Sequence, residues 1–334
     1  MKNPPSFSTS ELEIALRAGD RVALSRCITL AESDRASDQK KTATLLSRIH
    51  SHTGRSIRIG ISGVPGAGKS TWINVFGSML TRQGLKVAVL TIDPSSEKTR
   101  GSILGDKTRM DDLARDPLAF IRPSPSRSIL GGVTSHTREA ILLCEAAGYE
   151  VILVETVGVG QSETAVRHMV DFFLLMLIGG AGDELQGIKK GIIEMADGIL
   201  VNKADGASLG AATRARAELL QALHLYEQSS GEWKTRVLLT SAAEKKGLEE
   251  SWQMILDFKD TTTSSGQWAT QRSSQQLRWM EEYFNHQVQH SLQSNAAVRK
   301  QLKALGSNVE NGQLNPVAAA NTLFKIWSKT GRQK

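Results

Sequence analysis

One stretch of the chain has the residue types and spacing that can hold a phosphate group. The sequence GVPGAGKS fits the pattern GxxxxGK[ST] and lies between an apolar run and a segment with helical periodicity. Glycines in this pattern let backbone N–H groups close around a β-phosphate, while Lys69 places a positive charge against the β- and γ-phosphates and Ser70 offers a hydroxyl to Mg²⁺. We therefore predict a nucleoside triphosphate site formed by Gly63, Val64, Pro65, Gly66, Ala67, Gly68, Lys69, Ser70 and Thr71.

A second motif could read the base of the nucleotide. The sequence NKAD begins at Asn202, follows the apolar run GILV and fits the pattern NKxD. The carboxylate of Asp205 can accept from both N1–H and the exocyclic amine of guanine, and adenine offers no such pair of donors. Lys203 can lie along the base, and Asn202 can hold this loop to the phosphate-binding loop. The four-letter match is weak alone, but it gains weight from the later Ser241 and Ala242, whose backbone could meet the base oxygen.

Acidic residues stand where a metal ion and its waters would be held. Asp93 ends the run KVAVLTID, and Asp106 lies in the long hydrophilic segment that follows, which could otherwise be a solvated loop with capping aspartates. Glu155 ends another apolar run and precedes Gly158 in an ExxG loop, where most GTP-hydrolysing switches carry aspartate. The extra methylene of glutamate lets Glu155 reach a metal-bound or attacking water rather than ligate Mg²⁺ directly.

These motifs need a parallel sheet to bring them together. From Ser56 onward, short apolar runs bounded by glycines alternate with helix-length segments; the runs are IRIGISG, KVAVLTID, EVILVETVG, DFFLLMLIGG, DGILVNKAD and RVLLTSA. This alternation is typical of an α/β fold with helices on both faces of the sheet and a site at the carboxyl ends of the strands. We predict a P-loop NTPase with a mostly parallel central sheet over 55–260, an N-terminal helical extension over 1–54 and a C-terminal helical dimerisation region over 261–334.

Helical patterns flank the predicted sheet. They cover Ser10–Ala31, with a break at Gly19-Asp20, and then Asp38–His50; the polar stretch Asp260–Gln267 predicts a linker before further helices at Trp268–Gln293 and Pro316–Lys329. Aromatic faces of this kind usually mark interfaces, so we expect the C-terminal helices to form a homodimer. Their aromatic residues are Trp279, Tyr283, Phe284, Phe324 and Trp327.

Composition restricts the class of protein. The 334 residues are 40% apolar and 22% charged, without an apolar run of about eighteen residues or a secretory signal, so we expect a cytoplasmic protein and no membrane partner. A net charge of +7 is spread along the chain without an aromatic RNA-binding motif, so we expect no nucleic-acid partner. Cys27 and Cys144 lie far apart without a CxxC motif, which argues against a disulfide framework and a thiolate metal site. We expect both cysteines to be small buried apolar residues.

Several longer segments now suggest a family. The loop GVPGAGKS, with TRGSILGDKTRM, RPSPSR, ETVGVGQSE, GDELQGIKKGIIEMADGILVNKADG and GDRVALSRCITLAES, resembles the bacterial methylmalonyl-CoA-mutase-associated GTPases, the MeaB/ArgK group related to the human protein of methylmalonic aciduria type A. The resemblance implies a homodimeric GTPase that uses GTP/GDP and Mg²⁺. It implies a chaperone that gates adenosylcobalamin delivery to an acyl-CoA mutase and protects that mutase. It also implies catalytic roles for Lys69, Asp93 and Glu155, and a metal and water shell of Ser70, Asp93, Asp106 and Glu155.

A glycine-rich segment after the fourth of these runs departs from a plain GTPase. GGAGDELQGIKKG could simply lead into a helix, but the resemblance implies a loop that couples the nucleotide state to the mutase through Asp183, Glu184, Gln186, Lys189 and Lys190. No clear match to a water-positioning glutamine exists, so intrinsic hydrolysis should be slow.

Two other functions share some of these features. A kinase linked to amino-acid transport would need an acceptor pocket and a base, and the sequence identifies neither. A nickel-delivery GTPase usually shows histidine-rich tracts or paired Cys/His ligands, whereas the seven histidines here are dispersed.

Overall fold

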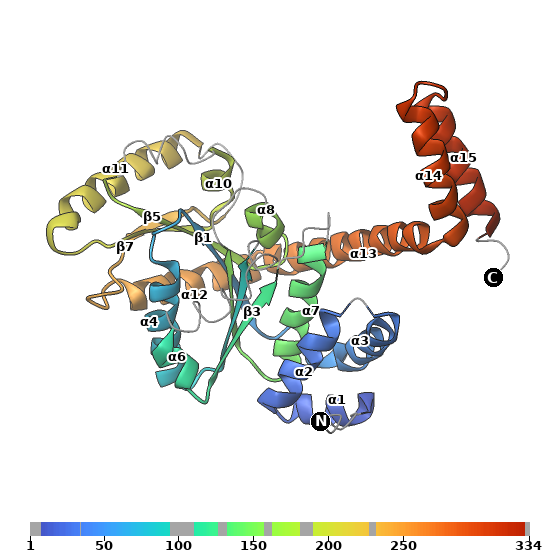
Figure 1. The fold of residues 1–334 in the computed structure, drawn as a ribbon. Helices are drawn as coiled ribbons and strands as arrows, with labels where there is room; N and C mark the ends of the chain where they lie inside the picture. The colour runs from blue at the N-terminus through green and yellow to red at the C-terminus, as the bar shows by residue number, and fades with distance from the viewer. Residues whose placement is uncertain are drawn as a thin grey trace. The chain divides into compact units, whose positions relative to one another are not determined.

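A parallel β-sheet forms the centre of the chain in the computed structural model, which describes residues 8–33, 35–93, 110–125, 132–156, 162–180, 190–226 and 232–330. Within these residues the sheet has seven strands in the order β3-β2-β4-β1-β5-β6-β7, and each pairing is parallel. Figure 1 shows this sheet and the helices beside it. The predicted α/β fold with a mostly parallel sheet is therefore confirmed. The strands are β1 (Ile57–Gly63), β2 (Val87–Asp93), β3 (Ala119–Pro125), β4 (Val151–Thr156), β5 (Phe172–Ile178), β6 (Gly198–Asn202) and β7 (Arg236–Leu239).

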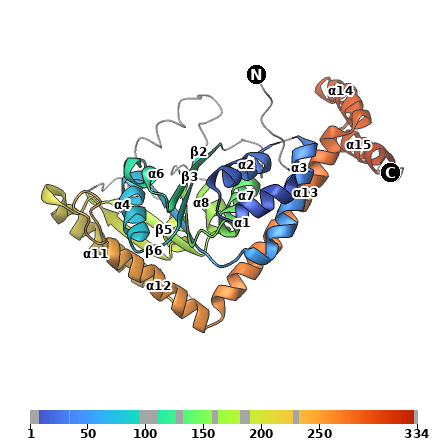
Figure 2. The same cartoon turned by 90° about the horizontal axis from the view of Figure 1, so that it is seen from below.

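Helices cover both faces of the sheet (Figures 1 and 2). Neighbouring residues of β2 show this arrangement, because Val87 joins one buried apolar cluster and Ala88 joins the other. A parallel sheet is normally buried on both faces in this way, which explains the nearly continuous apolar runs in the sequence. One layer contains α4 (Lys69–Arg82), α6 (Asp111–Arg115) and α12 (Leu248–Ser264), and the other contains α7 (Gly132–Ala146), α8 (Ser162–Arg167), α10 (Lys190–Met195) and α11 (Leu209–Tyr226).

The predicted N-terminal helices are present, with the predicted break between them. They are α1 (Thr9–Arg17), α2 (Arg21–Ala31) and α3 (Ala36–Ile49), followed by the short η1 (His50–His52). The break follows from local chemistry, because Gly19 adopts a φ of +81° and the Asp20 carboxylate caps α2 by accepting from Val22 N at 2.7 Å. Buried leucines of these helices share an apolar cluster with α7.

Strand β3 was missing from the sequence prediction. Pro123 and Pro125 lie in this strand and cannot donate to a ladder of hydrogen bonds. β3 is nevertheless an edge strand that pairs on one side with β2, and proline is tolerated at such an edge.

The predicted linker over Asp260–Gln267 was wrong, because α12 continues to Ser264 and α13 (Gln267–Ser294) begins almost at once. Thr261 and Thr262 donate to carbonyls one turn earlier, at 2.8 and 2.7 Å, and the Thr262 side chain is buried. Burial outweighs the weak helix propensity of the segment, and the two hydroxyls are satisfied by carbonyls of their own helix.

The chain divides into two compact units, residues 1–275 and 276–334. The second contains the later part of α13, then α14 (Ala296–Glu310) and α15 (Pro316–Thr330), where Asn315 caps α15 by accepting from Val317 N at 2.8 Å. Helix α14 was not predicted. The proposed domain boundary at residue 260 lies inside α12, and the ranges 1–54, 55–260 and 261–334 stay predictions. Among the described helices, none is long and apolar enough to cross a membrane.

A buried carboxylate joins three elements at the amino-terminal edge of the sheet. Asp197 precedes β6, accepts from Phe173 N of β5 at 2.8 Å, and pairs with Arg167 of α8 at 3.0 Å. Its own carbonyl accepts from Trp233 Nε1 at 2.8 Å. Burial raises the pKa of Asp197 from 3.8 to about 6, although Arg167 and the Phe173 N–H favour the charged form.

This shift predicts the pH dependence of stability. Because the pKa of Asp197 is higher in the folded chain, the folded chain binds more protons between about pH 4 and pH 6, and the free energy of unfolding falls as the pH rises through that window. Asp197→Asn should remove up to about 3 kcal/mol of that fall. Urea unfolding of the wild type and of Asp197→Asn at about pH 4 and about pH 7 measures the free energy of unfolding of each protein. The prediction is contradicted if the difference between these two free energies is the same at both pH values.

Candidate nucleotide-binding site

The phosphate-binding loop lies at the carboxyl end of β1 and leads into α4. Gly63 ends the strand and Lys69 begins the helix. Gly63 has a φ of +147°, and a Cβ there would lie 2.1 Å from the carbonyl oxygen of Met176. Gly68 has a φ of +83°, and a Cβ there would lie 2.8 Å from Nδ2 of Asn202. Both positions therefore require glycine for conformation and for close approach.

Lys69 is held inside this loop. Its Nζ donates to the carbonyl oxygens of Gly63 at 2.7 Å and Val64 at 3.2 Å, and the residue is buried. Burial lowers the pKa of Lys69, while the carboxylates of Glu155 and Glu163 oppose that change. The ammonium group thus lies beside the positive end of α4, where anions are favoured.

Two of the predicted metal-shell residues are in contact. Ser70 Oγ donates to Glu155 Oε1 at 2.9 Å. β4 brings Glu155 to this place, because it pairs in register with Ile61 of β1 and Thr91 of β2. A hydroxyl and a carboxylate are oxygen ligands of the kind that Mg²⁺ prefers, so these residues fit a magnesium site.

The remaining metal-shell predictions lie beyond what the structure describes. The backbone of Asp93 ends β2 and pairs with Pro125 of β3, but its side chain is outside the described part, as is the whole of Asp106. In the described ranges, no group of three or more His, Cys, Asp or Glu residues is placed to hold a metal ion.

The predicted base-reading loop is joined to the phosphate-binding loop. Asn202 Nδ2 donates to the carbonyl oxygen of Ala67 at 2.8 Å, which is the contact that the sequence predicts for Asn202. The Asn202 amide is oriented by Thr240, whose Oγ1 donates to Asn202 Oδ1 at 3.2 Å. These groups are buried, so they fix the two loops relative to each other.

Asp205 and Ser241 also meet. Ser241 Oγ donates to Asp205 Oδ2 in a short hydrogen bond and accepts from Glu244 N at 3.0 Å. Ser241 and Ala242 are buried, whereas Lys203 is exposed and has a φ of +57°. The loop thus holds one oxygen of the Asp205 carboxylate in a fixed orientation.

Three residues of the site had no assigned side-chain role in the sequence analysis. They are Thr240, Ser241 and Glu163. A threonine and a serine after a strand give no recognisable signal, because their partners come from distant loops. Glu163 follows the ExxG loop and is 2% exposed, and its burial near Lys69 could not be inferred from spacing.

Only the start of the predicted coupling loop lies within the described residues. A Cβ on Gly179 would lie 2.3 Å from backbone atoms of Ala212, so the end of β5 packs directly against α11. Helix α11 follows the base-reading loop and η2 (Gly206–Ser208). Asp183, Glu184, Gln186 and Lys189 lie outside the described residues, and so does the side chain of Lys190.

Comparison with known proteins shows which family the chain resembles. A model of the family described as methylmalonyl Co-A mutase-associated GTPase MeaB matches residues 24–297. GTPase ArgK of Escherichia coli is 48% identical over 301 residues, which cover 90% of this chain and 91% of that protein. The mitochondrial methylmalonic aciduria type A homolog of Mus musculus is 44% identical over 326 residues, covering 95% and 79% respectively.

A solved structure agrees with this relationship. The crystal structure of an LAO/AO transport system kinase has a TM-score of 0.74 and 39% sequence identity, and the match covers 97% of this chain and 99% of that chain. The chain therefore belongs to the MeaB family of methylmalonyl-CoA-mutase-associated GTPases.

Proposed function

We propose that this GTPase acts as a chaperone that gates adenosylcobalamin delivery to an acyl-CoA mutase of the methylmalonyl-CoA mutase type and protects that mutase. The hydrogen bond from Asn202 to Ala67 carries the nucleotide part of the proposal, because it joins a phosphate-binding loop to a base-reading loop. The partner is supported by the family description and by the name of the Mus musculus relative.

In this proposal the residues of the loop divide the work of hydrolysis. Lys69 and the amino-terminal end of α4 stabilise negative charge on the β- and γ-phosphates. Ser70 and Glu155, with Asp93 and Asp106, would hold Mg²⁺ and its waters, and bound Mg²⁺ supplies positive charge to the phosphate oxygens. Glu155 orients a water through its carboxylate. Because the sequence shows no clear match to a water-positioning glutamine, we expect intrinsic hydrolysis to be slow until a partner binds.

The coupling to the mutase is assigned to the segment that follows Gly179. This segment begins where β5 packs on α11, and α11 follows the base-reading loop. A partner can respond to the nucleotide only through contacts that differ between the two nucleotide states. We place those contacts at Asp183, Glu184, Gln186, Lys189 and Lys190.

Phosphate transfer to a second substrate is the alternative, since the solved relative carries the name of a kinase. The two functions differ in product. Hydrolysis releases inorganic phosphate in the absence of any acceptor, whereas a kinase requires an acceptor and transfers the phosphate to it. Phosphate release from GTP by the purified chain therefore separates them.

We expect a purified adenosylcobalamin-dependent acyl-CoA mutase to accelerate GTP hydrolysis by at least about tenfold, or roughly 1.4 kcal/mol of transition-state stabilisation. Replacing Lys189 and Lys190 by alanine should abolish the acceleration and spare the basal rate. The matched control replaces the exposed pair Lys40 and Lys41 on α3 by alanine, and it should keep the acceleration. Lys69→Ala serves as a second control, because we expect it to lose nucleotide binding. If the variant at 189 and 190 responds like the wild type, this segment is not the coupling element.

Asp205→Asn should change base preference. The substituted amide can keep its oxygen toward Ser241 and present its NH₂ group to the base, where xanthine offers an oxygen instead of the guanine amine. Affinity for GTP should fall at least about hundredfold and affinity for XTP should rise, as calorimetry can measure. Ser241→Ala is the control, because it loosens Asp205 without reversing donor and acceptor. Equal competition of ATP and GTP for the wild type would refute the guanine assignment.

We propose that the second unit forms the homodimer. Met280, Phe284 and Phe324 are 61%, 65% and 60% exposed in the single chain. Truncation after Gln275 should therefore give a monomer that still binds GTP, while the full chain sediments as a dimer. A full chain that sediments as a monomer at micromolar concentration would rule out this assignment.

A further inference from the structure

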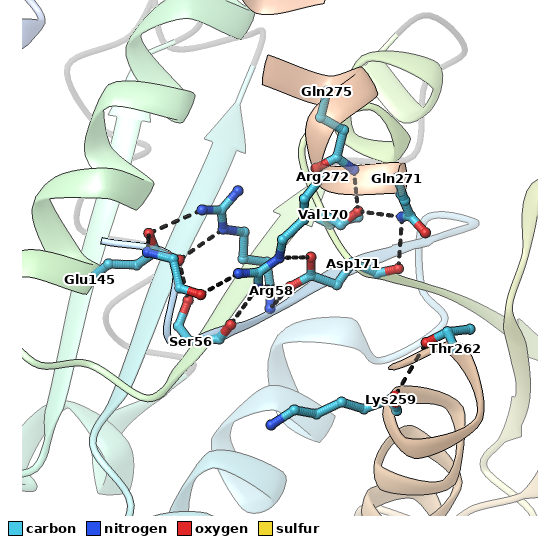
Figure 3. Close-up of polar contacts among 11 residues, drawn as sticks. Ser56, Arg58, Glu145, Val170, Asp171, Lys259, Thr262, Gln271, Arg272 and Gln275 are labelled. Atoms are coloured by element: carbon cyan, nitrogen blue, oxygen red, sulfur yellow. Dashed lines mark hydrogen bonds and ion pairs between the residues drawn. The ribbon is translucent and has the colours of Figure 1, made fainter. Parts of the chain in front are cut away.

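Figure 3 shows a cluster of polar and ionic contacts that includes Arg58, Asp171 and Arg272. The cluster lies at the amino-terminal edge of the sheet, because Asp171 directly precedes β5, whereas the nucleotide loops follow the strands. Arg272 of α13 forms two hydrogen bonds with the Asp171 carboxylate, from Nε at 2.8 Å and from Nη2 at 2.7 Å. The same guanidinium donates to the carbonyl oxygen of Ser56 at 2.6 Å and to that of Gly54. Arg272 thus binds the entry to β1 and the entry to β5 together.

Asp171 is held from the side of the sheet as well. Its Oδ2 accepts from Arg58 N at 2.8 Å, and its own N–H donates to the Arg58 carbonyl at 2.8 Å. The Asp171 side chain is 2% exposed and that of Arg272 is 14% exposed. The carboxylate is therefore buried with several hydrogen-bond donors around it, and the removal of one partner is costly.

Two glutamines extend the contact along the same face of α13. Gln271 Nε2 donates to the carbonyl oxygens of Val170 at 3.1 Å and Asp171 at 3.0 Å, and Gln275 Nε2 donates to that of Val170 at 2.7 Å. The turn formed by Val170 and Asp171 is therefore held by three polar side chains of α13. Hydrogen bonds depend steeply on distance and angle, so these contacts respond to small displacements of the turn in a way that apolar packing does not.

The turn is connected to α8, the helix that follows the Glu155 loop. Val166 of α8 and Val170 of the turn both lie against Gly60 of β1, where a Cβ would be 2.8 Å from Val166 Cγ1 and 2.9 Å from Val170 Cγ2. Arg167, between them, is paired with Asp197. A displacement of α8 along β1 therefore moves the turn, because the two valines occupy one tightly packed site.

We propose that Asp171, Gln271, Arg272 and Gln275 form a joint through which α8 passes the nucleotide state to α13. The inference rests on the proposed GTP-dependent function, since it needs α8 to shift between the GDP and GTP states. Residues that follow a nucleotide-contacting loop are common sites of such shifts. Helix α13 (Gln267–Ser294) contains the three joint residues Gln271, Arg272 and Gln275, and residues 276–294 belong to the same helix.

Hydrogen–deuterium exchange on the full chain tests the joint. With GDP and with a non-hydrolysable GTP analogue, the backbone amides of residues 276–294 should exchange at rates that differ by at least about fivefold in the wild type. Arg272→Gln should remove that difference and leave nucleotide affinity within about threefold of the wild type, because Arg272 lies away from the nucleotide loops. Arg278→Gln is the matched control, since Arg278 is an exposed arginine on the same helix, and it should keep the difference.

The outcomes separate the joint from the proposed function. If calorimetry shows no GTP binding by the wild type, the proposed function fails and the joint fails with it. If GTP binds and the exchange rates do not differ, or if Arg272→Gln keeps the difference, the joint alone is refuted. Should Arg272→Gln fail to fold, the double change Gln271→Leu and Gln275→Leu keeps the Arg272–Asp171 ion pair and removes the glutamine bonds to the carbonyls of the turn. It should reduce the difference in exchange rate, and an undiminished difference in that variant also refutes the proposal.

Discussion

The hydrogen bond between Asn202 and the Ala67 carbonyl is the constraint on which the nucleotide site depends. β1 and β6 are separated by β5 in the sheet, so their loops would meet only loosely without a buried contact between them. Gly68 makes the contact possible, because any Cβ at that position would collide with the Asn202 amide. The two loops that we propose to bind phosphate and base are thus joined into one structural unit.

The sheet separates two sets of buried charges. At the carboxyl edge Lys69 lies near Glu155 and Glu163, and burial lowers its pKa. At the amino-terminal edge, although burial opposes the shift, Arg58 lowers the pKa of the buried Glu145 carboxylate, which also accepts from Ser56 Oγ at 2.6 Å. The first set lies at the amino-terminal end of α4, where an anion is favoured, while the second is paired within the protein. This difference explains why the second set can hold elements in place, whereas the first is suited to binding an anion.

The sequence predicted the elements whose chemistry is local. Six of the seven strands were recognised as apolar runs, and the loop at Gly63–Ser70 by its glycines and lysine. The features that the sequence did not predict depend on residues that are distant along the chain. Strand β3 contains two prolines, which are tolerated because the strand lies at the edge of the sheet. Thr262 lies in a polar stretch that is nevertheless helical, and the Thr262 side chain is buried. Thr240 supports Asn202 through a side-chain bond that no periodicity reveals.

Helix α13 shows why the face that a helix presents to the protein cannot always be read from apolar spacing. Its first turns contact the sheet through Gln271, Arg272 and Gln275, which a hydropathy pattern assigns to solvent. The aromatic residues of the same helix led to the prediction of an interface, and one of them, Phe284, is 65% exposed in the single chain. A polar face that packs on the GTPase core, followed by an apolar face that is left uncovered, gives one helix two kinds of contact. Because polar contacts fix orientation and apolar contacts provide burial, the two ends of this helix are suited to different kinds of contact.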